Sequence, residues 1–454
     1  MTQRVSVIGG GLAGSEAAWQ LARRGVEVDL WEMRPVRSTE AHETESLAEL
    51  VCSNSFRDDS MGTAVGVLKQ EMRRMDSLIM RIADEVRVPA GGALAVDRVL
   101  FGQRVTEEIE ALPQVTIRRE EITAIPTEGI VIIATGPLTS PALSEELGKR
   151  LGTEHLYFYD AISPIITAES INMDIAFKAA RYGRGGDDYI NCPFDQEQYE
   201  QLVTDILAAD KMPTKSFERC IYFEGCMPVE EIARRGPKTL SFGPMKPVGL
   251  EDPRTGRRAH AVLQLRQDDT AGHLFSMVGF QTKMTYPEQR RVFRTIPGLQ
   301  KAEFVRLGSL HRNTYIDAPR TMAPTLAVRD AEGLYIAGQL VGVEGYVESA
   351  ATGLLAGINA SLQAHGQDRL ELPPSTSLGA LMGYISDPDR RDFQPMNANY
   401  GLFPPLPTRM RGREKKQEMG RRALADLDAW LATTGQGPTG SASAVSSQLG
   451  AKSA

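Results

Sequence analysis

The chain has 454 residues, of which 42% are hydrophobic and 24% are charged, and its net charge is −7. These values are ordinary for a globular protein, and the length predicts two or three domains. The negative charge argues against a generally basic nucleic-acid-binding protein, although a local patch can override the overall balance. No apolar run approaches the roughly 20 residues that a membrane helix needs. A strand at the very start leaves no room for a signal peptide, so we expect a cytoplasmic protein that spans no membrane.

Cysteine and histidine usage gives no sign of cross-links or metal sites. The four cysteines form no C-x-x-C motif and do not resemble a disulfide framework; they are Cys52, Cys192, Cys220 and Cys226. The six histidines form no cluster with cysteine at metal-ligand spacing, so we predict no metal site. Cys192 and Cys220 fit best as small buried apolar groups.

The order of elements at the start of the chain is that of a βαβ unit. An apolar run over residues 5–8 predicts a strand buried on both faces. A G-x-G-x-x-G motif over residues 9–14 follows and leads into a predicted helix over residues 15–24. A second strand over residues 26–32 ends in an acid. This order predicts a dinucleotide site, and a βαβ unit without a ligand is the alternative.

Each glycine of the motif has its own role in such a site. Gly9 allows a tight turn, Gly11 lets the backbone approach a pyrophosphate, and Gly14 lets the helix pack close to the strand. The free amides at the helix N-terminus would bind phosphates, and the acid would bind ribose hydroxyls. The predicted dinucleotide-binding residues here are Gly9, Gly10, Gly11, Leu12, Ala13, Gly14 and Glu32.

Apolar spacing predicts the elements that follow. A repeat of 4, 3, 4, 3 and 4 residues predicts one continuous amphipathic helix, with its apolar face formed by Leu68, Met72, Met75, Ile79, Ile82 and Val86. Residues 90–97 read as a glycine-bearing loop before a helix over residues 98–110. We expect strands over residues 115–117 and 121–125.

A second set of motifs resembles flavoproteins of the glutathione-reductase type. A buried strand over residues 129–136 runs into an Ala-Thr-Gly turn. Another strand over residues 333–339 ends in glycine, and a helix rich in small residues follows at 349–362. Two such motifs in one chain favour FAD over NAD. No second G-x-G-x-x-G motif follows a strand, so we expect no separate nicotinamide domain. The additional predicted FAD-binding residues are Gly136, Gly338, Glu344 and Gly345.

These motifs predict an α/β fold, with a glutathione-reductase-like FAD-binding Rossmann-type domain that carries an inserted α+β domain. The predicted FAD domain comprises residues 1–154 and 306–432, and the inserted domain comprises residues 155–305. The second part of the FAD domain ends in a helix with Leu424, Leu427 and Leu431 on one face, and basic side chains precede this helix. From residue 433 the composition predicts a disordered tail, 433–454.

Five segments together resemble one family. They are Gly-Gly-Gly-Leu-Ala-Gly-Ser-Glu-Ala-Ala at 9–18, Cys-Ser-Asn-Ser at 52–55, Tyr-Phe-Glu-Gly-Cys-Met-Pro-Val-Glu at 222–230, His-Arg-Asn-Thr-Tyr at 311–315 and Gly-Val-Glu-Gly-Tyr-Val-Glu-Ser at 342–349. Over about residues 1–430 the chain resembles TrmFO, the bacterial folate- and FAD-dependent tRNA (uracil-5-)-methyltransferase family. The last segment alone would also fit the relative MnmG/GidA, and the two cysteine segments favour TrmFO.

The resemblance implies formation of 5-methyluridine at position 54 in the T loop of tRNA. It implies that the methylene carbon comes from 5,10-methylenetetrahydrofolate through reduced FAD, with electrons from NAD(P)H. Carbon 5 of uracil needs a thiolate at carbon 6 before it becomes nucleophilic. By this resemblance Cys226 is the nucleophile, and Cys52 is its partner near the flavin, either as a base or by holding the methylene group. The division of roles between the two thiols stays open.

The resemblance also suggests contacts for folate and RNA. His311 would stack on the pterin; an ordinary hydrogen-bonded histidine is the alternative. Glu344 and Glu348 would orient flavin or folate, and capping of the next helix is equally compatible. A basic cluster would contact tRNA phosphates rather than form a solvated face, through Arg409, Arg411, Arg413, Lys415 and Lys416. The target base must leave the T loop to reach a buried flavin, so we expect a deep pocket.

Three other functions are compatible with parts of the sequence. An MnmG-like enzyme would modify the tRNA wobble uridine, but it does not explain the Cys52 and Cys226 segments. A plain NAD(P)H flavin reductase would leave both cysteines and the basic cluster without a role. A non-catalytic, FAD-holding tRNA-binding module would be yellow and would not turn over tRNA and folate. The oligomeric state and the preference for NADH or NADPH are not predicted.

Overall fold

The opening apolar run forms the central strand of a five-stranded parallel sheet in this computed structural model, which describes residues 4–152, 156–183, 185–212 and 227–437. The strand order is β16-β7-β1-β2-β6. The strands are β1 (Val5–Ile8), β2 (Val28–Trp31), β6 (Val115–Arg118), β7 (Ile130–Ile133) and β16 (Leu334–Ile336). All neighbours pair in parallel, which explains why β7 is buried throughout.

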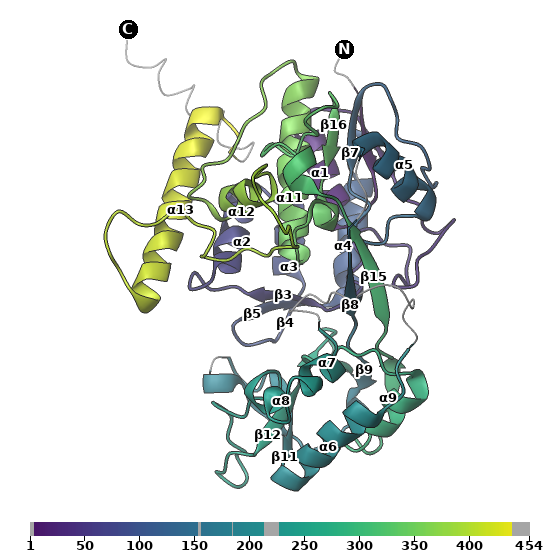
Figure 1. Ribbon diagram of the computed structural model, residues 1–454, viewed down its shortest axis with the longest axis vertical. Helices are drawn as coiled ribbons and strands as arrows, with labels where there is room; N and C mark the ends of the chain where they lie inside the picture. Colours follow the sequence, from purple (N-terminus) through teal and green to yellow (C-terminus); the bar gives the residue numbers. More distant parts are fainter. Residues whose placement is uncertain (1–3, 153–155, 184, 213–226, 438–454) are drawn as a thin grey trace.

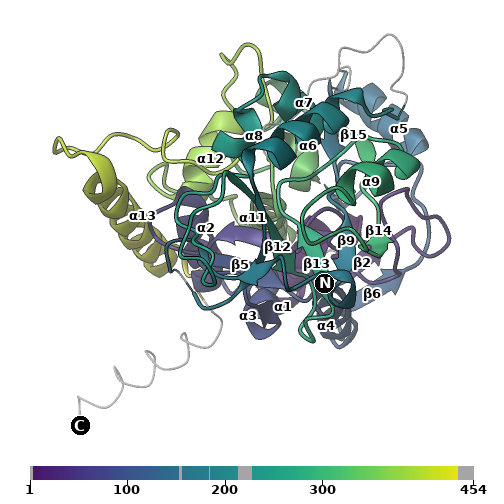
Figure 2. The same cartoon turned by 90° about the horizontal axis from the view of Figure 1, so that it is seen from below.

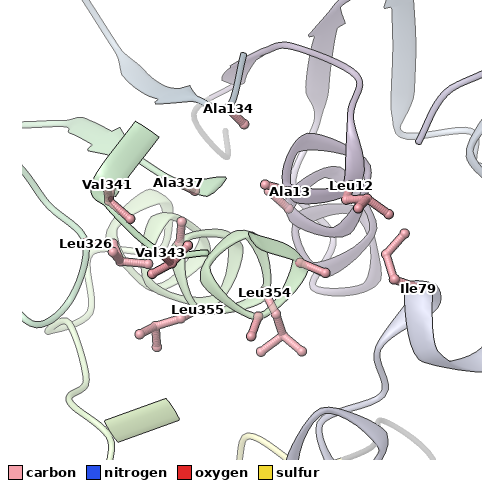
Figure 3. Close-up of a cluster of buried hydrophobic side chains, with 14 of the residues drawn as sticks. Leu12, Ala13, Ile79, Ala134, Leu326, Ala337, Val341, Val343, Leu354 and Leu355 are labelled. Carbon is pink, nitrogen blue, oxygen red and sulfur yellow. The ribbon is translucent and has the colours of Figure 1, made fainter. Parts of the chain in front are cut away.

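Two helices from opposite ends of the chain pack together beside this sheet (Figure 1). They are α1 (Leu12–Arg23) and α11 (Tyr346–Ala364). A Cβ atom on Gly353 would lie 2.1 Å from the carbonyl oxygen of Ala13, so only glycine permits this approach. Figure 3 shows Ala13 and Leu354 in the apolar cluster that the two helices share, with Ile79 pointing toward Leu12.

The predicted helix through residues 68–86 is wrong as one element. The structure has two helices, α2 (Ala64–Arg74) and α3 (Leu78–Glu85). Between them Asp76 adopts a φ of 57°, and the Ser77 side chain caps α3 by accepting from the N–H of Met80. All six apolar residues of the repeat are nevertheless buried, because the chain turns without changing the face it presents to the core.

Residues 90–97 were expected to form a loop, and they contain a strand instead. β5 (Ala93–Val96) pairs with β3 (Ser55–Asp58) and β4 (Arg87–Val88) in an antiparallel three-stranded sheet. The helix that follows is α4 (Arg98–Glu110), as predicted. No strand forms over residues 121–125, and β6 is the edge of the parallel sheet. After β7 the chain forms α5 (Pro141–Leu151).

A second body contains an antiparallel six-stranded sheet with its own apolar core, below the first body in Figure 1. Its order is β10-β11-β12-β13-β9-β14, with β9 (Ile165–Thr167), β10 (Phe177–Lys178), β11 (Tyr189–Phe194), β12 (Ala261–Gln267), β13 (Leu274–Met277) and β14 (Phe304–Arg306). Its helices are α6 (Gln196–Ala208), α7 (Val229–Arg234), α8 (Thr239–Phe242) and α9 (Tyr286–Phe293), seen from below in Figure 2.

A two-stranded ribbon connects the bodies. It consists of β8 (Leu156–Ala161) and β15 (Leu310–Tyr315), paired antiparallel. The proposed domain boundaries at residues 154 and 306 lie just before β8 and at the end of β14. They stay a proposal, which the separate apolar core of the second body supports.

The C-terminal part returns to the first body. After α10 (Ala318–Thr321), β16 and α11 come α12 (Ser377–Ile385) and α13 (Gly412–Thr434). Leu427 and Leu431 of α13 are buried and Leu424 is partly buried. The helix continues to Thr434, so a tail starting at residue 433 is slightly misplaced, and residues 438–454 lie outside the described residues. Within the described ranges, no helix is long and apolar enough to cross a membrane.

Candidate active site

The glycine motif forms a tight turn between β1 and α1. Gly9 has a φ of 103°, and a Cβ atom there would lie 2.6 Å from the carbonyl oxygen of Ala134. A Cβ atom on Gly14 would lie 1.7 Å from the carbonyl oxygen of Gly9. A Cβ atom on Gly11 would have no heavy atom within 4 Å, so the outer side of this glycine is open. The turn therefore excludes side chains on the protein side and leaves space on the other side.

Free amides face this space at the start of α1. In the described part of the chain the N–H groups of Leu12, Ala13 and Gly14 have no acceptor, and the first bonded amide is that of Ser15, which donates to Gly11. Unpaired amides and the positive end of the helix dipole form an anion site. The Gly10 amide differs, because it donates to Glu32 Oε2 at 2.9 Å.

Glu32 lies at the end of β2, where the sequence places the ribose-binding acid. Its carboxylate forms a buried ion pair with Arg34 at 3.0 Å. Burial opposes ionisation of Glu32, but the charge and hydrogen bonds of Arg34 outweigh burial and lower the pKa of the carboxyl group. Glu32 is therefore an ionised acceptor on the wall of a pocket that Gly9, Gly11 and Thr135 also line.

Two other predicted glycines have different surroundings. Gly136 follows β7 with a φ of 69° and has open space beside it. Gly338 has a φ of 79°, and its N–H donates to Thr352 Oγ1 at 2.7 Å. A Cβ atom there would lie 3.2 Å from the Ala13 side chain, so Gly338 serves packing between β16 and α1.

A larger cavity of about 290 Å³ lies where the two bodies meet. Predicted residues from distant segments gather on its wall: Cys52, Glu344 and Gly345. The second body contributes Arg266 from β12, and the ribbon contributes Asn313 from β15. The wall also includes Arg57 and Tyr346. The fold therefore brings one predicted catalytic residue and two predicted FAD residues into one cavity.

The backbone around Cys52 is held by the Tyr346 hydroxyl. That oxygen accepts from the N–H of Cys52 at 2.7 Å and from the N–H of Ser53 at 3.1 Å. Burial raises the pKa of Tyr346, so the group stays a neutral hydroxyl at neutral pH. The Cys52 thiol is half-buried and lies 3.8 Å from the carbonyl oxygen of Ala161, at the end of β8.

An ion pair connects β3 with α11 beside the same cavity. Arg57, with a φ of 64°, donates to both carboxylate oxygens of the buried Glu348. Glu348 also accepts from the N–H of Ala398 at 2.9 Å. Glu344 accepts from Gln339 Nε2 at 3.0 Å. Neither carboxylate caps α11, whose N-cap residue is Gly345 without a side-chain cap, so the capping alternative is wrong.

A buried lysine fixes the strand that carries Arg57. Lys69 of α2 donates to the carbonyl oxygens of Phe56 at 2.9 Å and Arg57 at 3.0 Å. Burial lowers the pKa of Lys69 to about 8, although nearby Asp59 favours the charged form. One side chain of α2 thereby holds two consecutive carbonyl groups in the middle of β3. No periodic pattern marks Lys69 for this role.

The second body reaches the Cys52 segment through Arg266. Its Nε donates to Asn54 Oδ1 at 2.8 Å, and its Nη2 donates to Ser53 Oγ at 2.7 Å. Next to it, Arg98 of α4 and Asp268 form a buried ion pair at 3.0 Å. Two arginine side chains, Arg98 from α4 and Arg266 from β12, therefore lie beside the cysteine segment. Sequence reasoning missed Arg57, Arg266 and Tyr346, although Arg57 and Tyr346 lie in or beside segments that resemble TrmFO.

The remaining cysteines and the predicted histidine either have no described side chain or lie away from the cavity. Cys226, like Cys220, falls outside the described residues. His311 belongs to β15, where its backbone pairs with Asp160, but its side chain is not described. Cys192 lies in the core of the second body, and burial raises the pKa of its thiol to about 12, which fits the small apolar role expected for it.

The basic cluster lies at the N-terminal end of α13, far along the chain from the cavity residues. All five side chains are exposed, and none pairs with an acid in the described part of the chain: Arg409, Arg411, Arg413, Lys415 and Lys416. Positive charge at a helix N-terminus opposes the helix dipole. Residues 4–152, 156–183, 185–212 and 227–437 contain no group of His, Cys, Asp and Glu that could hold a metal ion.

The parallel sheet, its glycine turn and the antiparallel insertion define an FAD-dependent oxidoreductase-like fold. Residues 4–368 match the family model of glucose inhibited division protein A. The structure resembles GidA of Aquifex aeolicus with a TM-score of 0.69 at 17% identity, covering 96% of this chain and 74% of that one.

Closer relatives define the family itself. A methylenetetrahydrofolate–tRNA-(uracil-5-)-methyltransferase TrmFO of Geobacter sulfurreducens is 58% identical over 434 residues, which is 95% of this chain and 100% of the relative. One of the same name from Moorella thermoacetica is 58% identical, covering 93% and 97%. The chain belongs to the TrmFO family, as the two cysteine segments predicted.

Proposed function

We propose that this protein methylates carbon 5 of uridine 54 in the T loop of tRNA. The carbon comes from 5,10-methylenetetrahydrofolate, and the electrons come from NAD(P)H through FAD. The observation that carries the proposal is the position of Cys52, on a cavity that both bodies line and that shares Leu138 with the pocket at the glycine turn. Relatives with this printed function match nearly the whole chain. A tRNA substrate makes the cytoplasm the proposed location.

The residues present fit an FAD molecule. The open side of Gly11, the free amides of Leu12 and Ala13 and the ionised Glu32 suit its pyrophosphate and ribose. At the cavity, Glu344 and Gly345 would face the isoalloxazine end. When bound, FAD supplies hydride transfer and a carrier for the one-carbon unit.

The protein side chains have three tasks in this reaction. A thiolate must add to carbon 6 of uracil so that carbon 5 becomes nucleophilic, and we assign this task to Cys226. Once carbon 5 has bonded to the methylene carbon, the proton on carbon 5 must leave, and we assign its removal to Cys52, whose backbone Tyr346 fixes. The Arg266 guanidinium, on the same cavity wall, would stabilise the negative charge that develops on the uracil oxygens. Loss of the proton and of the thiolate leaves an exocyclic methylene group on carbon 5, and the hydride that bound FAD would supply reduces this group to methyl.

The remaining proposed contacts concern the large substrates. His311 would stack on the pterin from β15, the strand that also carries Asn313 of the cavity wall. The cluster at Arg409–Lys416 would bind tRNA phosphates, which explains why it tolerates an unfavourable helix dipole. A uracil flipped out of the T loop would enter the cavity between the two bodies.

Labelled methylenetetrahydrofolate tests the reaction and its position together. The purified yellow protein is incubated with NAD(P)H and with tRNA transcripts that carry or lack uridine 54. We expect label only in the transcripts that carry it, and Cys226→Ser should abolish transfer while the protein stays yellow. Label that depends on the wobble uridine instead would support an MnmG-like enzyme. A yellow protein that binds tRNA but transfers no label would support a non-catalytic module.

A further inference from the structure

A turn of the second body carries an exposed aromatic ring and has a lysine at each end. It spans Lys238 to Lys246 and includes α8 (Thr239–Phe242). Phe242 is 77% exposed, the largest value among the exposed large hydrophobic side chains of the described ranges. Lys238 and Lys246 are also exposed, and neither pairs with an acid in the described part of the chain. We call Tyr182, Lys238, Phe242 and Lys246 the α8 surface.

Contacts on its inner side hold this turn in place, and the turn keeps Phe242 exposed. Leu240 and Met245 on its inner side are fully buried in the core of the second body. The N–H of Met245 donates to the carbonyl oxygen of Leu240 at 2.9 Å. The Tyr199 hydroxyl donates to the carbonyl oxygen of Pro237 at 2.7 Å and accepts from the N–H of Ser241 at 3.2 Å. These contacts fix both ends of the short helix.

A second aromatic side chain lies beside this turn. Tyr182 is 58% exposed, and its ring packs so close to Gly249 that a Cβ atom there would lie 2.6 Å from it. The neighbouring Arg181 donates to the carbonyl oxygens of Lys246 and Val248, each at 2.6 Å. Arg181 thus ties the Tyr182 segment to the turn that carries Phe242. Tyr182 and Phe242 therefore lie on two segments of the second body that hydrogen bonds hold together.

In Figure 1 the N-terminal end of α13 lies above the junction of the two bodies, and α8, the helix that carries Phe242, lies below it. A large RNA that delivers a base to the cavity at this junction would span both. Rigid exposed aromatic rings flanked by unpaired cations match the way proteins bind unpaired bases and their phosphates.

We propose that the α8 surface is a second RNA-binding surface, on which Phe242 stacks on an unpaired base of the tRNA and Lys238 and Lys246 contact its phosphates. The proposal rests on tRNA being the substrate. It assigns to the second body a binding role that is separate from the basic cluster of α13 and from the cavity. RNA without unpaired bases would meet only the lysines.

Equilibrium binding to the FAD-loaded full-length protein tests the proposal. Phe242→Ala should raise the Kd for tRNA roughly tenfold, the size expected for loss of one stacked base. Phe242→Trp should restore binding. A fully paired RNA duplex should bind equally well to both variants. Matched controls are Tyr286→Ala, which removes a 48% exposed ring at the start of α9, and Lys301→Glu, which removes another exposed lysine of the second body.

Salt dependence separates the lysines from the ring. The double variant Lys238→Glu, Lys246→Glu should weaken binding of both RNAs and reduce the slope of log Kd against log salt, by about 0.7 to 0.9 per lost phosphate contact. Equal binding by all variants, or equal weakening by the controls, would overturn the proposal. Label transfer by the unsubstituted protein tests the proposed function independently. Phe242 is exposed, so an unchanged thermal midpoint confirms folding.

Discussion

At the scale of single residues, polar side chains inside the protein hold the backbone of the candidate site in place. The Tyr346 hydroxyl provides the acceptor for two successive amides, those of Cys52 and Ser53. Arg266 reaches the same segment from the second body. The role proposed for Cys52, removal of a proton from a substrate carbon, needs such a fixed position, because small displacements reduce the rate strongly.

Replacing Tyr346 with phenylalanine should therefore impair both catalysis and stability. The two amides would lose their acceptor, at a cost of about 1–3 kcal/mol each if they stay buried. We expect the kcat for label transfer to fall at least about tenfold as the Cys52 segment shifts. Tyr335→Phe is the matched control, because it removes a buried hydroxyl that bonds Gln363, at 2.6 Å, away from the cavity. Full kcat in Tyr346→Phe would show that the hydroxyl does not position Cys52.

At the scale of elements, buried carboxylates of one helix satisfy the free amides of another. Glu16 of α1 accepts from Ser77 Oγ and from the N–H of Ile79 at the start of α3. Glu71 of α2 accepts from the N–H groups of Ser377 and Leu378 at the start of α12. Each contact joins helices distant in sequence and compensates free helix ends.

The Glu71 contact should make stability depend on pH. Burial raises the pKa of Glu71 from 4.5 to about 7, so between these values the folded protein keeps a proton that the unfolded chain has lost. The free energy of unfolding should therefore fall as pH rises through this range, by up to about 1.4 kcal/mol per pH unit. Glu71→Gln does not titrate and should show a flatter dependence in urea unfolding from pH 5 to 8. Parallel curves for both proteins would contradict this.

Gly353 should tolerate no side chain where α11 crosses α1. A methyl group would overlap the carbonyl oxygen of Ala13, so Gly353→Ala should separate the helices and lower the unfolding midpoint by several degrees. FAD content should fall with it, because α1 carries the amides that we propose bind the FAD pyrophosphate. Gly383→Ala in α12 is the control, since nothing lies within 4 Å of its Cβ position and alanine favours helix there. An equal midpoint in both variants would show that the crossing relaxes.

At the scale of the whole molecule, the cavity exists only because the two bodies are held together by polar contacts. The Arg98–Asp268 pair is buried on both sides. Asn54 donates to the carbonyl oxygens of Val96 and Gln267, both at 2.9 Å, and so joins one body to the other. Thr270 donates to Asp97 at 2.9 Å.

Asp268→Asn should loosen the junction strongly. It leaves the buried Arg98 without its counter-charge, which typically costs about 3–5 kcal/mol. We expect a lower thermal midpoint and a higher KM for methylenetetrahydrofolate, since the cavity wall would shift. Asp205→Asn is the control, because it breaks an exposed pair with Arg291 that is worth less than about 1 kcal/mol. Similar midpoints for both variants would show that the junction does not depend on this pair.

Local chemistry explains which parts of the fold were predictable. The glycine turn, β1 and the bounds of α4 follow from residues that are neighbours in sequence. The break at Asp76 was missed because the apolar repeat continues across it, and only the backbone turns. The strand at 93–96 was missed because glycines precede it, and because only one of its partners, the two-residue β4, is near in sequence while β3 lies far back in the chain.

In the candidate site, too, the residues that belong to local motifs were predictable and the others were not. Cys52, Glu344 and Gly345 could be selected from motifs, and the fold brings them to one cavity. Arg266 and Lys69 could not, because a buried cation is defined by the partners it meets. Those partners, Ser53, Asn54 and the backbone of β3, lie on other elements. A single sequence contains no pattern for such pairs.

The packing of α11 against α1 has a consequence for synthesis. The ribosome releases β1, the glycine turn and α1 first, yet the edge of β7 stays open until β16 has emerged, and Ala13 stays uncovered until Gly353 arrives. Contacts so distant in sequence form late in folding. The nascent first body must therefore wait, with apolar surface exposed, while the second body folds. Chaperone dependence during translation should fall sharply once α11 leaves the exit tunnel.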